Sequence, residues 1–375
     1  MADKGWTAPE TRPCYDRARE LCDRIGDTEG LFPVLYGQFS NHLSRGEADA
    51  AHGLALQTLQ LTEGTEGDPA LRSMAHSMLG MSLFSRGELG PALTHLRTAL
   101  SLDQSDSRSH TFLSPGHNFA IASMWLALTL LLLGYPEQAS LHAGAGLRTA
   151  RELSNPHTLA HTLALACRYH SALGETTALH QATEELAALA AEHRFPFYVA
   201  AAQIYRGWAL SATHDMARGI EVMQEGTAAF MDLGATALRP FFWAKIAVLS
   251  AAAGSARDGL DLLDQALEQV DQSGQRWCEA ELHRSKGELL SGFFDAPLAE
   301  SCLQRSLVTA RRQCARLWEL RAACSLGRLW RDQGKHNRAS DLLGPIYAWF
   351  AEGFDTPDLK EAKALLDALS GENSR

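Results

Sequence analysis

The sequence predicts an all-α repeat protein, a solenoid of helix-turn-helix units, and three observations support this prediction. The apolar residues are mainly Ala and Leu, which favour helices, whereas the β-branched residues that strands prefer are few. Small residues recur every forty residues, and a glycine follows most of them seven residues later. A chain of 375 residues is long for one core, but a solenoid needs none because each repeat packs only on its neighbours.

The repeat is marked by a small residue on one helical face, which we call the anchor. The anchors, in chain order, are Phe39 (loosely), Gly80, Ala127, Cys167, Gly207, Ala247, Gly287 and Gly327. A second small residue follows most anchors after twelve residues, as at Ala92 and Gly219. Small residues are expected where two antiparallel helix axes approach within about 8–10 Å. The glycine between them ends the first helix in a left-handed conformation.

These anchors divide the chain into eight repeat units between residues 31 and 350. Residues 1–30 are predicted to hold an unpaired helix, the second half of a repeat whose first helix is missing. Residues 351–375 are predicted to form a capping helix with a polar tail, which solenoids need for solubility. The unpaired N-terminal helix exposes an apolar face, so a homodimer through this half repeat is one alternative.

The pattern resembles that of tetratricopeptide repeats from Leu31 to about Phe350, and its clearest copy runs from Met78 to Leu100. It departs from the family in its period of forty residues and in the degenerate copies that follow Cys167 and Gly207. The resemblance implies a right-handed α-solenoid of about eight repeats, in which the first helices line a concave groove.

Several stretches carry a closer resemblance. They are LFPVLYG (31–37), LGYPEQA (133–139), EAELHRSKGELL (279–290), WELRAA (318–323) and the segment 345–362. Together they resemble the C-terminal repeat region of bacterial signalling proteins that join a class III adenylate/guanylate cyclase to an AAA-type ATPase. This resemblance implies a sensory or partner-binding role. Nucleotide chemistry is not implied, because the sequence has no G-x-x-x-x-G-K-[ST] loop.

Composition narrows the partner and the compartment. A net charge of −10 makes nucleic acid an unsuitable partner, because phosphate backbones are usually met by a basic face. The longest apolar run, Met124–Leu133, is about half a bilayer span, so no membrane contact is expected. Seven cysteines without a C-x-x-C pair indicate reduced core residues of a cytoplasmic protein.

The repeat frame predicts which side chains line the groove. From the N-terminal end they are Tyr36, Met81, Phe84, Met124, His161, Arg168, Trp208, Phe241, Arg284, Glu288, Arg321 and Arg328. An apolar end and an arginine-rich end would suit an extended peptide or an acidic or hydrophobic small molecule, because Arg holds carboxylates bidentately. The alternative is that the apolar residues are core and that the arginines pair with Glu281 and Glu288.

No catalytic, metal or cofactor site is predicted. His157 and His161 have the i, i+4 spacing of a helical metal pair, but the run lacks the Glu of H-E-x-x-H. A G-x-S-x-G elbow is absent as well. The first hypothesis is therefore a non-catalytic scaffold that binds a protein or peptide. The alternative is a small-molecule receptor, or a solenoid recruited as an enzyme, with a pocket at the middle of the groove.

Overall fold

The computed structural model describes Thr7 and residues 11–63, 68–103, 116–212, 215–293 and 295–372. Over these residues the chain is helical and forms no strand. The predicted fold class, an all-α repeat solenoid, is confirmed. Most of the first ten residues, and residues 373–375 of the predicted polar tail, lie outside the described residues.

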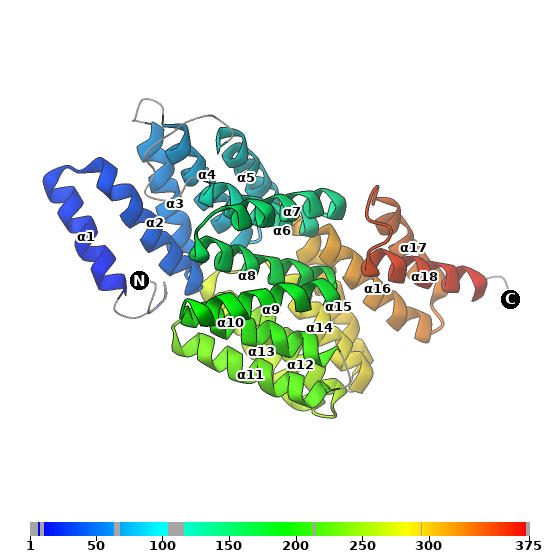
Figure 1. Cartoon of the computed structure of the whole chain (residues 1–375). Coiled ribbons are helices and arrows are strands. Elements are labelled where there is room, and N and C mark those ends of the chain that lie inside the picture. The colour runs from blue at the N-terminus through cyan, green and yellow to red at the C-terminus, as the bar shows by residue number, and fades with distance from the viewer. Residues whose placement is uncertain are drawn as a thin grey trace.

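The described helices alternate as the first and second members of repeats, with a single helix before them and another after them (Figure 1). The N-terminal helices are α1 (Thr11–Ile25), α2 (Thr28–Ser44), α3 (Ala48–Glu63), α4 (Pro69–Ser85), α5 (Leu89–Asp103), α6 (His117–Leu133), α7 (Pro136–Glu152), α8 (Pro156–Leu173) and α9 (Thr176–Glu192). The C-terminal helices are α10 (Pro196–Ser211), α11 (Met216–Asp232), α12 (Arg239–Ala252), α13 (Ala256–Ser273), α14 (Glu279–Phe293), α15 (Ala296–Arg312), α16 (Arg316–Asp332), α17 (His336–Ala348) and α18 (Pro357–Glu372).

Small residues bring the two helices of a repeat together, as the anchor pattern predicts. In the α10–α11 pair, a Cβ added to Gly207 would lie 2.6 Å from the carbonyl oxygen of Gly219 and 2.6 Å from the backbone nitrogen of Met223. The backbones are therefore in contact at this crossing. Gly174, at the end of α8, has φ of 81°, the left-handed conformation that the turn requires.

The first helix of the chain, α1, packs against α2. A Cβ at Gly37 of α2 would lie 2.0 Å from Cε1 of Tyr15, so the tyrosine ring rests directly on the α2 backbone. Leu21 and Ile25 on α1 stay exposed, at 43% and 73%. The homodimer through this helix stays a prediction.

The winding returns onto itself at the N-terminal repeats. The backbone nitrogens of Thr236 and Ala237, in the turn before α12, each donate to the Ser44 carbonyl at the end of α2, both at 3.1 Å. In the same way the nitrogens of Arg276 and Trp277, before α14, donate to the Ser85 carbonyl at the end of α4, at 2.8 and 3.3 Å. The C-terminal end of each of these first helices is thus hydrogen-bonded to the loop that precedes the first helix five repeats later.

The same contact pattern continues toward the C-terminus. The Glu352 carboxylate accepts hydrogen bonds from the backbone nitrogens of Glu137 and Gln138, at 3.0 and 3.2 Å, at the start of α7. The Gly353 nitrogen in turn donates to Oε1 of Glu137, at 3.0 Å. Arg321 on α16 donates to the Ala172 carbonyl in α8, at 2.6 Å. We call these contacts between distant repeats the closure of the superhelix, and it encloses the interior described next.

Candidate functional site

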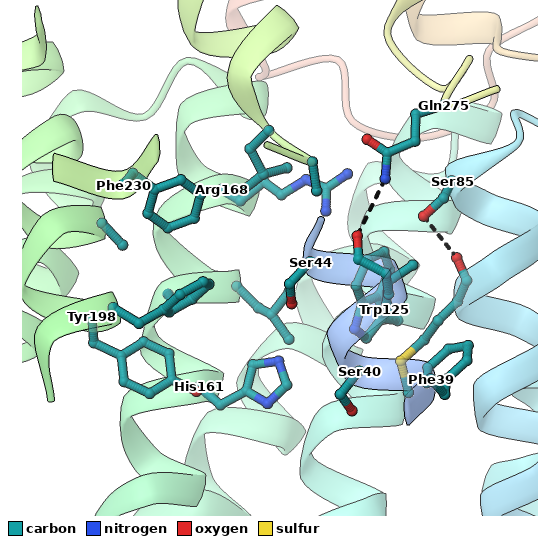
Figure 2. A pocket seen from close by; sticks show the side chains of 18 of the residues that line it. Phe39, Ser40, Ser44, Ser85, Trp125, His161, Arg168, Tyr198, Phe230 and Gln275 are labelled. Carbon is teal, nitrogen blue, oxygen red and sulfur yellow. Dashed lines mark hydrogen bonds between the residues drawn. The ribbon is translucent and has the colours of Figure 1, made fainter. Parts of the chain in front are cut away.

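A cavity of about 120 Å³ lies inside the closure, and we call it the central cavity. The first helices α2, α4, α6, α8 and α10 form most of its wall, and Phe230 of α11 completes this side. The docked loops contribute Ala237, Leu238, Gln275 and Trp277. Figure 2 shows His161 and Tyr198 facing the helix that carries Ser40 and Ser44. The lining is mainly aromatic and aliphatic, so the cavity suits an apolar group.

Arg168 brings a positive charge to this apolar lining. The side chain is buried, at 3% exposure, and its guanidinium carbon lies 4.0 Å from the Trp277 ring centre, 5.0 Å from that of Phe84 and 5.1 Å from that of Trp125. In the described part of the chain no carboxylate pairs with it. Burial lowers the pKa of Arg168 to about 10, while Tyr205 and Cys278 oppose this change. Three aromatic faces hold the cation, and no carboxylate among the described residues neutralises it.

Other buried polar atoms around the central cavity also lack partners. Nε of Arg168, Nε1 of Trp125, Oη of Tyr205 and Oε1 of Gln275 form no hydrogen bond with any described residue. All four residues line the cavity, and each is at most 6% exposed. Buried polar groups in folded proteins are almost always hydrogen-bonded. These donors and acceptors are therefore buried in the wall of the cavity without a described partner.

Histidines and tyrosines form one end of the site. A hydrogen bond of 2.7 Å joins Nδ1 of His117 to Oγ1 of Thr158, and one of 3.4 Å joins Nε2 to Oη of Tyr36. The rings of His157 and His161 lie 5.5 and 6.4 Å from that of Tyr198. Burial lowers the pKa of His117 and His157 to about 4 and that of His161 to about 3, so all three are neutral at pH 7.

Acid is therefore expected to destabilise the protein at unusually mild pH. In the unfolded chain a histidine takes up a proton near pH 6.5, whereas these folded-state pKa values are depressed, so stability is fully present above 6.5 and is lost as pH falls toward 4. We expect a loss on the order of 1–2 kcal/mol per histidine between pH 7 and pH 5. Urea denaturation across this range measures it.

In the variant His161→Gln, the loss of stability between pH 7 and pH 5 should be smaller by the contribution of one histidine. The exposed His180 on α9 provides the matched control, and His180→Gln should leave the curve unchanged. Equal slopes for the two variants would contradict the assignment of the effect to the buried cluster.

At the predicted middle of the groove, the structure places two aromatic residues beside the central cavity. The Trp208 ring lies 5.3 Å from that of Phe241, which is buried and lies 5.0 Å from the ring of Trp277. Nζ of Lys245 lies 5.2 Å from the Trp208 ring. Of the two predicted residues, neither borders the cavity directly, but Phe241 supports Trp277, which does.

The arginine-rich end predicted from the sequence forms a separate pocket of about 310 Å³. Its cations are paired. Arg284 contacts Glu281 and Glu288, both at 2.6 Å, and Arg321 contacts Asp358 at 2.6 and 2.8 Å. The remaining cation, Arg328, contacts Glu288 at 3.0 Å and also Glu361. This is the internal pairing that the sequence left open, and it neutralises the arginines from within.

The four predicted apolar contacts have different surroundings. Tyr36 and Met81 line the central cavity. Phe84 is fully buried and does not border the cavity, but with Trp125 and Trp277 it forms the aromatic cage around the Arg168 guanidinium. Met124 is fully buried on the other side of α6, where its Cγ approaches the Gly146 backbone of α7. The role of the twelve predicted residues as ligand contacts stays a prediction.

Several lining residues were not predicted from the sequence. Ser44 and Ser85 each lie five positions after an anchor, and Ser40 lies one position after Phe39, but none was among the predicted groove residues. Phe197 and Tyr198, at the start of α10, were not among them either. The loops before α12 and α14 line the cavity only because of the closure, and the closure leaves no periodic pattern in the sequence. The stretch Arg276-Trp277-Cys278 between two helices was the available hint, since a loop rarely carries a buried Trp.

Other chemistry is sparse. Within the described ranges no group of three or more His, Cys, Asp or Glu side chains is placed to hold a metal ion. Cys167, Cys278 and Cys324 are buried, and burial raises the pKa of each thiol to about 12. Contrary to the prediction of mainly buried cysteines, Cys14 and Cys314 are exposed. None of the described helices combines the length and apolar character needed to cross a membrane.

The comparisons with known proteins agree on the fold. No protein-family model matches the chain. The Rap protein complexed with competence and sporulation factor superposes with a TM-score of 0.58 at 10% identity, over 91% of this chain and 98% of Rap. The Cut9–Hcn1 hetero-tetramer of the APC/C gives 0.61 at 12% identity, over 96% of this chain and 59% of the matched chain. The fold is a tetratricopeptide-type solenoid.

One curated protein is similar in sequence. An uncharacterized protein of Rhizobium meliloti is 21% identical over 292 residues, which cover 76% of this chain and 28% of that protein. The chain thus spans less than a third of the length of this relative. At sequence identities of 10–12%, the similarity to the solved structures supports the fold alone.

Proposed function

We propose that this chain is a non-catalytic, regulatory binding scaffold that captures an extended peptide of a partner protein, with an acidic group of that peptide docked against Arg168. The single observation that carries the proposal is this buried cation beside the central cavity, which no described carboxylate neutralises. A buried charge without a partner is costly, and a ligand carboxylate would remove that penalty on binding. A ligand without this carboxylate would bind more weakly, and this difference makes the site specific for acidic ligands.

The shape of the site supports a particular docked group. A cavity of about 120 Å³ is close to the size of apolar cavities of about 150 Å³ that accept a benzene ring. One aromatic or branched side chain, with a carboxylate beside it, would therefore fill it. A C-terminal residue with a free carboxylate has this composition, and bidentate contact with Arg168 would orient it.

The similar proteins fit this proposal. Rap is solved in complex with competence and sporulation factor, and Cut9 in complex with Hcn1. The resemblance to the repeat region of cyclase–ATPase signalling proteins favours a regulatory role in the bacterial cytoplasm. The relative in Rhizobium meliloti, of which the chain spans 28%, is consistent with a repeat region that occurs within longer proteins.

A small-molecule receptor is the second candidate, and the two loops over the central cavity favour it. Ala237, Leu238, Gln275 and Trp277 of these loops line the cavity beside the helices. A pocket covered in this way would suit an aryl-substituted carboxylic acid as well as a peptide end. Binding of the free acid with the affinity of the peptide would favour this candidate.

The experiment compares two probes on three proteins. The probes are N-acetylated octapeptides of mixed sequence ending in phenylalanine, and 3-phenylpropionate, each as the free acid and as the amide. The proteins are the wild type, Arg168→Met and, as a matched control, the exposed-site variant Arg257→Met on α13. Calorimetry and thermal shift measure binding.

We expect the free-acid peptide to bind wild type and Arg257→Met alike. Its affinity for Arg168→Met should be about 10- to 100-fold lower, as expected for the loss of a hydrogen bond to a charged group. The amide should already bind weakly to wild type and should lose little more. Peptide affinity that is independent of both Arg168 and the carboxylate would contradict the proposal.

A further inference from the structure

A second cation without an acidic partner among the described residues is linked to Arg168 through aromatic rings. Lys245 on α12 is half-buried, and its ammonium group faces the ring of Trp208 at 5.2 Å. Among the described residues no carboxylate pairs with it. Burial lowers the pKa of Lys245, and the positive charge of Arg321 lowers it further. Like Arg168, this lysine has no counter-charge among the described residues, although it is only partly withdrawn from water.

A continuous row of rings connects the two cations, and we call it the aromatic row. It starts at Trp277, whose ring centre is 4.0 Å from the Arg168 guanidinium, and passes to Phe241 at 5.0 Å. From Phe241 it passes to Trp208 at 5.3 Å, and Trp208 faces Lys245 at 5.2 Å. Each of these steps is at van der Waals range for rings. The result is a row of rings with a cation at each end, in which Phe241 and Trp277 are buried and Trp208 is partly exposed.

The neighbouring arginines show that unpaired cations are not a general property of this interior. Arg284, Arg321 and Arg328 are held by Glu281, Glu288, Asp358 and Glu361. The fold therefore supplies carboxylates where it stabilises cations by itself. At Arg168 and Lys245 it supplies aromatic faces instead, which attract a cation and leave its charge available to a ligand.

We propose that the peptide bound by this scaffold carries two carboxylates separated by an apolar stretch, one docked at Arg168 and the other at Lys245. The inference rests on the proposed function, because it assigns the second anchor of the same ligand. The partly exposed Trp208 ring is the part of the aromatic row on which the apolar stretch stacks, and the two cations fix the direction and length of that stretch. A monoacid would leave Lys245 uncompensated and would bind more weakly.

A peptide series tests the second carboxylate without relying on any variant's fold. Each peptide is N-acetylated, ends in phenylalanine with a free carboxylate, and has one glutamate placed one to five residues before the end. Each has a partner in which glutamine replaces the glutamate. Binding is measured to wild type, to Lys245→Met and to Lys360→Met, an exposed-lysine control on α18.

At the best-fitting spacing we expect glutamine to weaken binding to wild type and to Lys360→Met by about tenfold, the size of one charge-assisted contact. For Lys245→Met the glutamate and glutamine peptides should bind within about twofold of each other. The variant Lys245→Arg should restore the preference for glutamate, which separates charge recognition from a packing defect.

Two results overturn the inference, and they differ in what else they overturn. If glutamate and glutamine peptides bind wild type equally at every spacing, while binding still depends on Arg168, the second carboxylate is wrong and the peptide scaffold stands. If no peptide of the series binds in an Arg168-dependent way, the proposed function fails together with the inference.

Discussion

Replacing Arg168 with methionine is expected to stabilise the ligand-free protein by about 1–2 kcal/mol, because it removes a buried charge that no described carboxylate compensates. The lowered pKa of about 10, against 12.5 for an exposed arginine, corresponds to a penalty on the order of 3 kcal/mol. Cation–π attraction to Phe84, Trp125 and Trp277 is not part of that penalty and offsets some of it. Methionine fills the same cage and retains sulfur–aromatic contacts.

The sign of this effect with pH follows from the depressed pKa. Below about pH 10 the arginine is protonated in both the folded and the unfolded states, so the penalty is present throughout the neutral range. Above pH 10 the folded state releases the proton and the penalty fades. The gain from Arg168→Met should therefore be constant from pH 7 to 9, which urea denaturation measures.

Arg284→Met is the matched control and should act in the opposite direction. Arg284 is also buried, but it holds Glu281 and Glu288, whose carboxylates would be left in a low-dielectric interior. Breaking a buried pair in this way costs about 3–5 kcal/mol. If both substitutions destabilise the protein, Arg168 has an internal partner after all, and its availability to a ligand is refuted.

A gain in stability at Arg168 would also bear on function. Natural sequences tend to retain a destabilising residue in the interior where it acts on a ligand or substrate. The structural alternative, a cation kept only for packing, does not explain why methionine would serve better. Stability measured without any ligand therefore tests whether Arg168 is kept for binding.

Gly207→Ala is expected to lower the free energy of unfolding by about 2–3 kcal/mol, which is a large effect for a single methyl group. The added Cβ would lie 2.6 Å from the Gly219 carbonyl oxygen and 2.6 Å from the Met223 nitrogen, both of which are backbone atoms. A flexible side chain can move aside, but two packed helices must separate. Loss of cooperativity in the thermal transition should accompany the loss of stability.

Gly144→Ala provides the control at a glycine of the same helical conformation. Gly144 lies on the exposed face of α7, with nothing within 4 Å of an added Cβ. Alanine should stabilise the protein there by about 0.5–1 kcal/mol through helix propensity alone. If both alanine variants gain stability, the helix crossing at Gly207 is wider than the structure has it.

The sequence contains enough information to predict the repeats and the helix crossings. Gly207 and Gly219 follow the predicted spacing because the two helices of every repeat approach closely at the same place. That shared requirement appears in the sequence as a periodic pattern of small residues. Arg168 was placed among the inward residues for the same reason, since it follows an anchor by one position. These predictions depend on local structure, which spacing along the chain encodes.

The closure and the surroundings of Arg168 could not be predicted in the same way. The approach of Gln275 to Leu43, or of Glu352 to Gln138, depends on how the small rotation between neighbouring repeats accumulates. Small errors in each step add up over five repeats, and no residue pattern records the sum. Whether Arg168 finds a carboxylate likewise depends on distant helices, whereas Arg284 pairs with Glu281 and Glu288 on its own helix, α14.

The closure alters how the molecule responds to stress. An open solenoid is nearly one-dimensional, and its repeats can fray or unfold in succession from either end. Here Thr236 bonds to Arg45 across 191 residues and Gly353 bonds to Glu137 across 216. Such contacts raise the contact order, which slows folding and couples distant repeats into one cooperative transition. The free energy of local opening then approaches that of complete unfolding. A ligand in the central cavity would therefore bind only while the whole superhelical turn is folded.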